Sequence, residues 1–147
     1  TYGRSPLENS SFLVSSANFN EKIHGKGFVA RLSGSTAEFL QMWELMMNGE
    51  KLFTMQDGTL TFKLAPAIPA YLVKDDGKVE TTLFGKIKVV YDCGSKRDLI
   101  PGQYAVTKYE LVAADGSIES CEAATVSGEA AQRIRDGKVA EIRVTIQ

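Results

Sequence analysis

The residues best suited to chemistry lie together between Arg31 and Thr36, a segment that reads Arg-Leu-Ser-Gly-Ser-Thr. It places a guanidinium and three hydroxyls directly before a predicted helix, and Gly34 allows the backbone to turn tightly there. Free amides at the start of a helix favour an anion, and hydroxyls with a guanidinium complete a phosphate-sized cradle. Arg31, Gly34, Ser35 and Thr36 are therefore candidate phosphate ligands, and Ser33 is a candidate for lining the same site.

A helix cap is the simpler and more common explanation of the same segment. Ser35 stands three residues before Glu38, the S-x-x-E capping box, in which each side chain bonds the other's backbone amide. The two interpretations are compatible, because Ser33, Thr36 and the free amides would still be able to face a ligand.

The rest of the sequence offers little other chemistry. The single histidine, His24, lies beside a glycine without a serine or cysteine motif, which is more typical of a loop residue than of a catalytic base. Cys93 and Cys121 have no CxxC spacing, so free thiols in a reducing compartment are the default. One histidine and two cysteines argue against a metal site, and no close carboxylate pair or nucleotide loop is recognisable.

Composition sets the class of protein. With 147 residues, 44% apolar and 24% charged, the chain is long enough for one folded domain. A net charge of -1 gives no attraction to nucleic acid or to an anionic membrane, and the apolar stretches are far too short to span a bilayer. We expect a cytoplasmic protein with neither partner. A start at Thr-Tyr-Gly-Arg, without Met, suggests a piece of a longer protein.

One helix should position the candidate ligands. Residues 1–34 are rich in Gly, Ser and Asn and predict mostly loop, with one or two short extended pieces. Apolar residues from Ala37 to Met47 then follow helical spacing, and Asn48-Gly49 is a left-handed stop, so a helix is predicted over about 36–47. Trp43 on this apolar stripe is expected in a core rather than against a sugar.

From Glu50 onward the pattern is that of strands and turns. Alternation predicts strands over 59–64 and 141–146, with further candidates at 86–91 and 104–112. Hairpins are predicted at the three Asp-Gly dipeptides, 57–58, 76–77 and 115–116.

Two irregular features interrupt these strands. A short helix is predicted near 128–136, capped by Ser127 and ended by Asp136-Gly137. Tyr71 follows a Pro-Ala-Ile-Pro segment and is expected to anchor that crossing, although it could stack on a ligand. Half-polar strands must bury one face each, so the fold class is mainly β, a β-sandwich or jelly roll.

The segment Arg31–Phe39, the helix ending at Gly49, Asp57–Leu60 and Pro66–Pro69 together resemble the C-terminal part of the inverting glycoside phosphorylases. This is the cellobiose and chitobiose phosphorylase family, and residues 3–30 look closest to its 1,2-β-oligoglucan branch. The resemblance implies that residues 1–49 end an (α/α)6 catalytic barrel and that 50–147 form a jelly-roll-like β domain.

The resemblance also implies an activity. Such enzymes transfer a glycosyl unit from a β-glucoside to inorganic phosphate with inversion, which gives an α-sugar 1-phosphate without a cofactor. The general acid, an aspartate, belongs upstream of Thr1, so this chain alone would be inactive. The family's phosphate-contacting threonine matches Ser35 without a gap, with Thr36 as the alternative. Its phosphate-binding histidine motif is absent here, and His24 would at most line the site.

The implied partners are the upstream barrel, phosphate and a β-glucan oligosaccharide, with a homodimer left open. The alternative from another class is a non-catalytic carbohydrate-binding β-sandwich module. The helix at 36–47 separates the two, because a free module has no use for a helix with an uncovered apolar face, whereas a barrel remnant must carry one.

Overall fold

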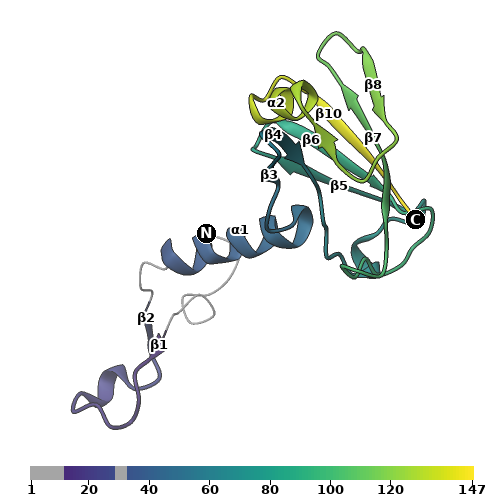
Figure 1. Ribbon diagram of the computed structural model, residues 1–147. Coiled ribbons are helices and arrows are strands. Elements are labelled where there is room, and N and C mark those ends of the chain that lie inside the picture. The colour runs from purple at the N-terminus through teal and green to yellow at the C-terminus, as the bar shows by residue number, and fades with distance from the viewer. Residues whose placement is uncertain (1–11, 29–32) are drawn as a thin grey trace. The chain divides into compact units, whose positions relative to one another are not determined.

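A computed structural model describes residues 12–28 and 33–147 (Figure 1). The chain divides into two compact units, Thr1–Gln41 and Met42–Gln147. The division falls inside a helix, and Met47 in the last helical turn is only 2% exposed and belongs to the core of the second unit.

Residues 12–28, the described part of the first unit before the helix, are mostly loop, as predicted. The short strands β1 (Phe12–Leu13) and β2 (Gly27–Phe28) pair antiparallel and correspond to the expected extended pieces. Between them lies the single 3-10 turn η1 (Glu21–Ile23). The loop is closed by backbone bonds from Val14 to Lys26 (3.1 Å) and from Gly25 to Val14 (2.9 Å).

Helix α1 (Ser33–Asn48) ends as the sequence predicted. Gly49 has a φ of +97°, and its amide donates to the carbonyl of Leu45 at 2.9 Å. A left-handed residue directly after the last turn is the usual glycine stop, because glycine alone has no Cβ to clash there.

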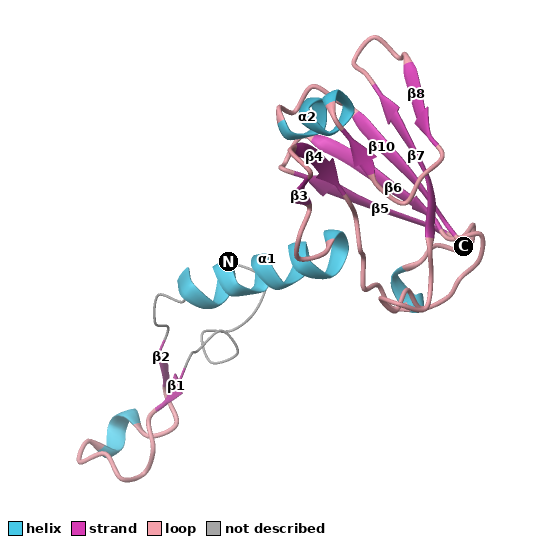
Figure 2. Ribbon diagram, in the orientation of Figure 1, coloured by secondary structure: helices cyan, strands magenta, loops and turns pink. Residues whose placement is uncertain are grey.

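The second unit is built on a five-stranded sheet in the order β5-β6-β10-β7-β8 (Figure 2). Its strands are β5 (Lys78–Leu83), β6 (Ile87–Asp92), β7 (Val106–Val112), β8 (Ile118–Cys121) and β10 (Glu141–Ile146). Neighbours are antiparallel except β10 and β6, which run parallel, a pairing that an all-antiparallel jelly roll lacks. The chain is mainly β, with two layers as expected for a β-sandwich.

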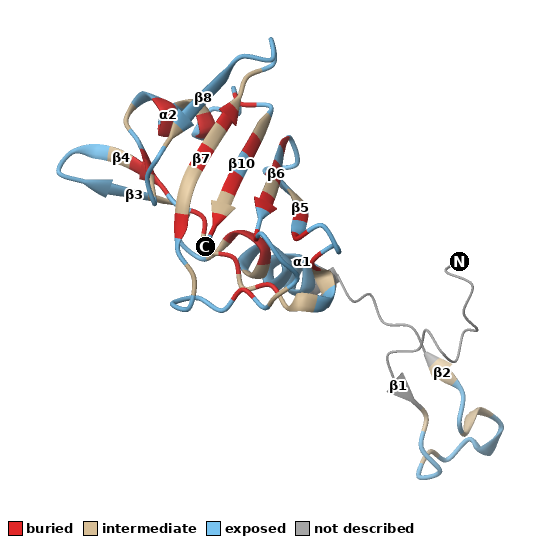
Figure 3. Ribbon diagram, turned by 90° about the vertical axis from the view of Figure 1, so that its right-hand side faces the viewer, coloured by how far each residue is buried: buried red, intermediate tan, exposed pale blue. Residues whose placement is uncertain are grey.

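Buried and more exposed residues alternate along β5, β6 and β10 (Figure 3), whereas a register shift opposite the start of β7 interrupts the alternation and β8 contains no buried residue. One cross-strand row of the inner face joins Val79, Tyr91, Val144 and Tyr109, each at most 4% exposed. Period-two alternation thus places every second residue in the core, which is why the strand predictions from apolar alternation succeeded.

A second layer covers the inner face. It consists of a three-stranded sheet and α2 (Glu129–Arg135), which contacts two of its strands (Figure 1). The strands of this sheet are β3 (Phe53–Gln56), β4 (Thr59–Phe62) and β9 (Val126–Ser127). Phe62 of β4 is fully buried, and its ring centroid lies 6.2 Å from that of Tyr109 on the large sheet. The two layers therefore share one core.

The outer face of the large sheet is polar and charge-balanced. Lys74 and Lys88 both pair with Glu80 (3.1 and 3.6 Å), and Arg143 pairs with Glu141 (2.6 Å). The Lys74 ammonium lowers the pKa of Glu80, and the Glu141 carboxylate raises the pKa of Arg143. These pairs are exposed to water, so each contributes little to stability.

Two of the three predicted hairpins are confirmed. Asp57-Gly58 joins β3 to β4, with φ of +48° and +77°, and Asp115-Gly116 turns β7 into β8. The prediction at Asp76-Gly77 is wrong, because this turn leads an irregular segment into β5 rather than joining two strands. The hairpin that joins β5 to β6 turns at Phe84-Gly85 instead, with Phe84 at φ +53°.

The short helix α2 lies where it was predicted, but its cap was assigned wrongly. Ser127 ends strand β9, and the N-cap is Gly128, at φ +68°, without any side-chain hydrogen bond. The reason is spatial: the amide of Gly128 donates to the carbonyl of Leu60 at 2.9 Å, so sheet pairing holds the chain up to the residue before the helix.

Two aromatic residues are exposed, although Tyr71 was expected to anchor the crossing and Trp43 to lie in a core. Tyr71, in the 3-10 turn η2 (Ala70–Leu72), is 79% exposed, whereas Ile68 and Val73 on either side of it are 1% and 2% exposed. Ile68 and Val73, rather than Tyr71, therefore anchor the crossing. Trp43 is 40% exposed, because only the last turn of α1 reaches the β core.

Three tyrosine hydroxyls form hydrogen bonds with backbone groups of the segment 47–66. The hydroxyl of Tyr91 donates to the carbonyl of Met47 at 2.7 Å, and the amide of Leu64 donates to the hydroxyl of Tyr109 at 3.0 Å. Tyr104 donates to the carbonyl of Pro66 at 2.7 Å. Each phenol satisfies a backbone group that would otherwise be buried without a partner.

These phenols predict loss of stability in alkali. Burial raises the pKa of Tyr91, and it raises the pKa of Tyr104 and of Tyr109 to about 12. The folded state thus favours protonated tyrosine. The contribution of these phenols to the unfolding free energy is therefore complete below about pH 10 and declines as the pH rises toward about 12. The ionisation of Tyr109 alone should lower the unfolding free energy by about 1.4 kcal/mol for each pH unit of increase within that window.

Urea unfolding followed at several pH values between neutrality and about pH 11.5 measures this effect. The unfolding free energy should stay level to about pH 10 and then fall, and the fall should be shallower in Tyr109→Phe. An identical alkaline slope in the two proteins would contradict the role given to Tyr109.

Candidate functional site

The structure places the predicted phosphate segment at the start of α1. Ser33, Gly34, Ser35 and Thr36 form its first turn. The first four backbone amides of an α-helix have no partner within the helix, so they remain available to an anion or to a cap. Arg31 and the side chains of residues 33–36 lie outside the described part of the chain.

The helix begins two residues before Ser35, so the capping box was assigned wrongly. An N-cap residue precedes the first turn, whereas Ser35 lies within it. The preference for a hydroxyl at the N-cap amounts to only about 1 kcal/mol. Because Ser33, Ser35 and Thr36 all carry hydroxyls, this preference does not determine which residue opens the helix.

His24 is held by its own loop. It ends η1, and its Nε2 donates to the carbonyl of Asn18 at 2.7 Å. This bond fixes the ring within the loop between β1 and β2 and agrees with the loop-residue interpretation. A role of His24 in lining a phosphate site stays a prediction.

Residues that could serve metal or thiol chemistry are not assembled in the described part of the chain. No group of three or more His, Cys, Asp or Glu side chains there could hold a metal ion. Both cysteines are free, and burial raises the pKa of Cys93 and of Cys121. Their thiols are therefore protonated at neutral pH and poorly nucleophilic.

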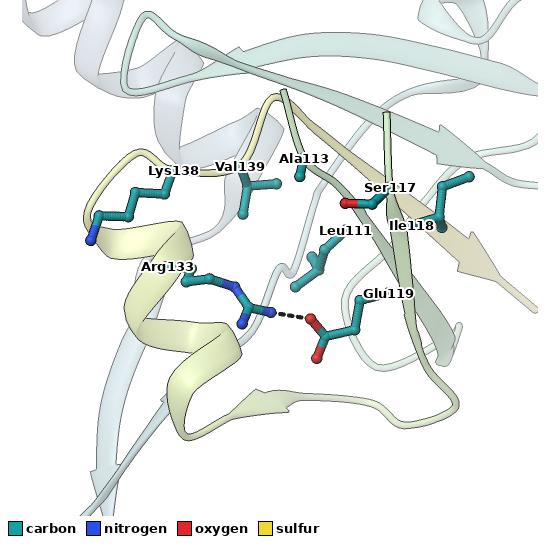
Figure 4. A pocket seen from close by; sticks show the side chains of 8 residues that line it. All are labelled: Leu111, Ala113, Ser117, Ile118, Glu119, Arg133, Lys138 and Val139. Carbon is teal, nitrogen blue, oxygen red and sulfur yellow. Dashed lines mark hydrogen bonds and ion pairs between the residues drawn. The ribbon is translucent and has the colours of Figure 1, made fainter. Parts of the chain in front are cut away.

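A pocket of about 330 Å³ opens between the hairpin of β7 and β8 and helix α2 (Figure 4). Aliphatic side chains line it from β7, from β8 and from the turn before β10: Leu111, Ala113, Ile118 and Val139. Leu111 and Val139 are 3% and 5% exposed, so they belong to the edge of the core.

An ion pair spans this pocket. Glu119 of β8 and Arg133 of α2 pair there, with half-exposed side chains (Figure 4). Glu119 lies opposite Leu111 in the register and so takes an inner-face position in a row that otherwise continues with Val89 and Ile142. A charge at an inward position of an edge strand discourages pairing with other chains, and it gives this pocket a polar rim.

Two further polar groups complete the rim. The hydroxyl and the amide of Ser117 both donate to Oδ1 of Asp115, at 2.6 and 2.9 Å, and these bonds lower the pKa of Asp115. The ammonium of Lys138 points away from the ion pair and lies 3.8 Å from Asp136 (Figure 4). The lining thus carries two cations and one carboxylate.

Sequence analysis did not find this pocket. Glu119 and Arg133 are far apart in the chain, and their meeting depends on how β8 pairs with β7 and where α2 docks. A signal did exist: β8 reads Ile-Glu-Ser-Cys, an alternation whose inward positions hold Glu119 and Cys121. Assigning inward and outward positions required the register, which local pattern does not supply.

Comparison with known proteins adds no assignment. The chain matches no protein-family model, no curated protein and no solved structure. Among the described helices, none has both the length and the apolar character that a bilayer crossing requires.

Proposed function

We propose that this chain is the C-terminal portion of an inverting glycoside phosphorylase, nearest the 1,2-β-oligoglucan branch. It supplies the last helix of an (α/α)6 barrel, part of the phosphate site and a two-layered, sandwich-like β domain that differs from an all-antiparallel jelly roll in its parallel β6–β10 pairing. Support comes from the segment Arg31–Phe39 and the Pro66–Pro69 segment, which resemble that family, and from the state of helix α1.

The observation that carries the proposal is the apolar stripe of α1, which none of the residues in the described ranges 12–28 and 33–147 covers. Phe39, Met42, Trp43 and Met46 are spaced three or four residues apart and so share one helix face. This face is continuous with the buried end of the helix at Met47, yet Phe39 and Met42 are 62% and 67% exposed. An amphipathic helix is stabilised mainly by packing of its apolar face, so a larger helical body is the expected cover.

The chemistry follows from the position of the helix start. Phosphate has to be held both as a charge and as a nucleophile, and free amides with neighbouring hydroxyls orient it without forming a covalent bond. Arg31, Gly34, Ser35 and Thr36 supply these groups, with either Ser35 or Thr36 in direct contact and Ser33 lining the site. An upstream aspartate protonates the glycosidic oxygen while phosphate attacks the anomeric carbon, so the product is an α-sugar 1-phosphate.

Trp43 is a direct reporter of the missing cover, because it is the only tryptophan in the chain. Acrylamide should quench its fluorescence strongly in the isolated chain and at least about threefold less in the full-length gene product, where a barrel covers the stripe. The same full-length protein should form α-sugar 1-phosphate from a 1,2-β-linked glucan oligosaccharide and inorganic phosphate, whereas the isolated chain should not.

Two results would contradict the proposal. Equal quenching in both proteins would mean that no upstream body covers α1. Oligosaccharide binding by the isolated chain, without phosphorolysis by the full-length protein, would favour the carbohydrate-binding module instead. The outer sheet face gives that alternative no support, because its residues in the described strands are charged, hydroxylic or aliphatic and include no aromatic ring for a sugar to stack on.

A further inference from the structure

We propose that the pocket between the β7–β8 hairpin and α2 binds a small aliphatic carboxylate, whose head group pairs with Arg133 in place of Glu119. This site is separate from the phosphate segment at the start of α1. It rests on three features of the described residues: the cavity, its aliphatic floor and the exchangeable ion pair across it.

The cavity is large enough for a small ligand, and no side chain in the part of the chain that the structure describes fills it. Its volume of about 330 Å³ lies at the lower end of the range for small-molecule sites. Its floor is made by Leu111 and Val139, which are already part of the core, so the walls are firmly placed. Because Leu111 and Val139 are almost inaccessible, an alkyl chain would gain contact mainly at Ala113 and Ile118, and each methylene that it removes from water would raise affinity by at most about fourfold.

Arg133 provides the recognition of a carboxylate. Its guanidinium already binds one carboxylate, that of Glu119, and the pair is half-exposed, with side chains 42% and 50% accessible. Exposed ion pairs have little net strength, so a ligand carboxylate can replace Glu119 at small cost and presents the same fork-shaped acceptor. Glu119 then turns to water at the free edge of β8.

Charge selects the sign of the ligand. The Lys138 ammonium is directed away, toward Asp136, so the charges that face the pocket are the Arg133 guanidinium and the Glu119 carboxylate. The ligand head group pairs with Arg133, so an alkylammonium of the same length would be repelled by the guanidinium, and a neutral alcohol would gain from the floor but not from Arg133. The ligand class is therefore an amphipathic anion of about the size of a five- or six-carbon carboxylic acid.

The probe is sodium hexanoate, titrated into the isotope-labelled whole chain and followed by amide chemical shifts in NMR spectra. Saturable shifts should appear at amides of 111–119 and 133–139, with hexan-1-ol about tenfold weaker and hexylammonium without effect. Arg133→Gln should weaken hexanoate about tenfold. The matched control is Arg143→Gln, which breaks the similarly exposed pair of Arg143 with Glu141 and should change binding less than about twofold.

Glu119→Gln is the sharpest variant, because it removes the competing carboxylate and should strengthen hexanoate binding about threefold or more. A variant that failed to fold would not gain affinity, so an increase supports the proposal regardless of changes in stability. The proposal is overturned if hexanoate shifts do not saturate, if Arg133→Gln and Arg143→Gln act alike, or if Glu119→Gln weakens binding.

Discussion

Replacing Phe62 with alanine should lower the unfolding free energy of the β unit by about 3–5 kcal/mol, the range for large-to-small changes of buried aromatic residues. Phe62 is fully buried, and its ring centroid lies 5.1 Å from that of Phe53 and 6.2 Å from that of Tyr109. It therefore joins the small sheet to the large one, and its loss leaves a cavity between the two layers.

Urea unfolding monitored by circular dichroism measures this change. The matched control is Phe19→Ala, the same truncation at a side chain that is 98% exposed, which should alter stability by less than about 0.5 kcal/mol. A loss of under about 1 kcal/mol for Phe62→Ala would mean that the two sheets do not share one core.

Local patterning predicted the strands well where one face alone is buried. The strand Glu141–Ile146 has the bounds that its alternation predicted, and its buried residues are those at the apolar positions. Each of these strands meets water on one side, so period two is visible in the sequence itself. Strand order was not predictable in this way, and the parallel pairing of β10 with β6 depends on contacts between segments far apart in the chain.

The hairpins show how tertiary contacts override turn chemistry. Asp76-Gly77 has the residues of a hairpin turn, but no strand precedes it. The actual turn places Phe84 at a positive φ that favours Gly or Asn. Phe84 stacks on Phe53, with ring centroids 6.2 Å apart and ring planes 17° from parallel. A side-chain contact between the two layers thus stabilises a turn that no local rule favours.

The two candidate sites differ in how much of each could be predicted from the sequence. The helix after Arg31, its glycine stop and its apolar stripe all follow from local spacing, and the structure confirms the helix and its end. Its first residue was misplaced, because several hydroxyls compete for the cap. The Arg133–Glu119 pocket was out of reach, since it arises from strand register and helix docking together.

The most direct test of the central claim, that the start of α1 holds phosphate, is the phosphate dependence of phosphorolysis by the full-length protein. Ser35→Ala and Thr36→Val each remove one hydroxyl from the first helical turn. Losing a hydrogen bond to a charged ligand typically costs about 1.5–3 kcal/mol, so the variant at the contacting residue should raise the KM for phosphate about tenfold or more.

The KM for the oligosaccharide should stay within about twofold in the same variants, because the proposal assigns these hydroxyls to phosphate and not to the glycoside. Ser127→Ala, at an exposed position in β9, is the matched control and should leave both constants unchanged. The proposal is supported if the phosphate KM rises in Ser35→Ala or in Thr36→Val but not in Ser127→Ala. Phosphate constants equal to those of Ser127→Ala in both variants, or a full-length protein without phosphorolysis, would contradict it.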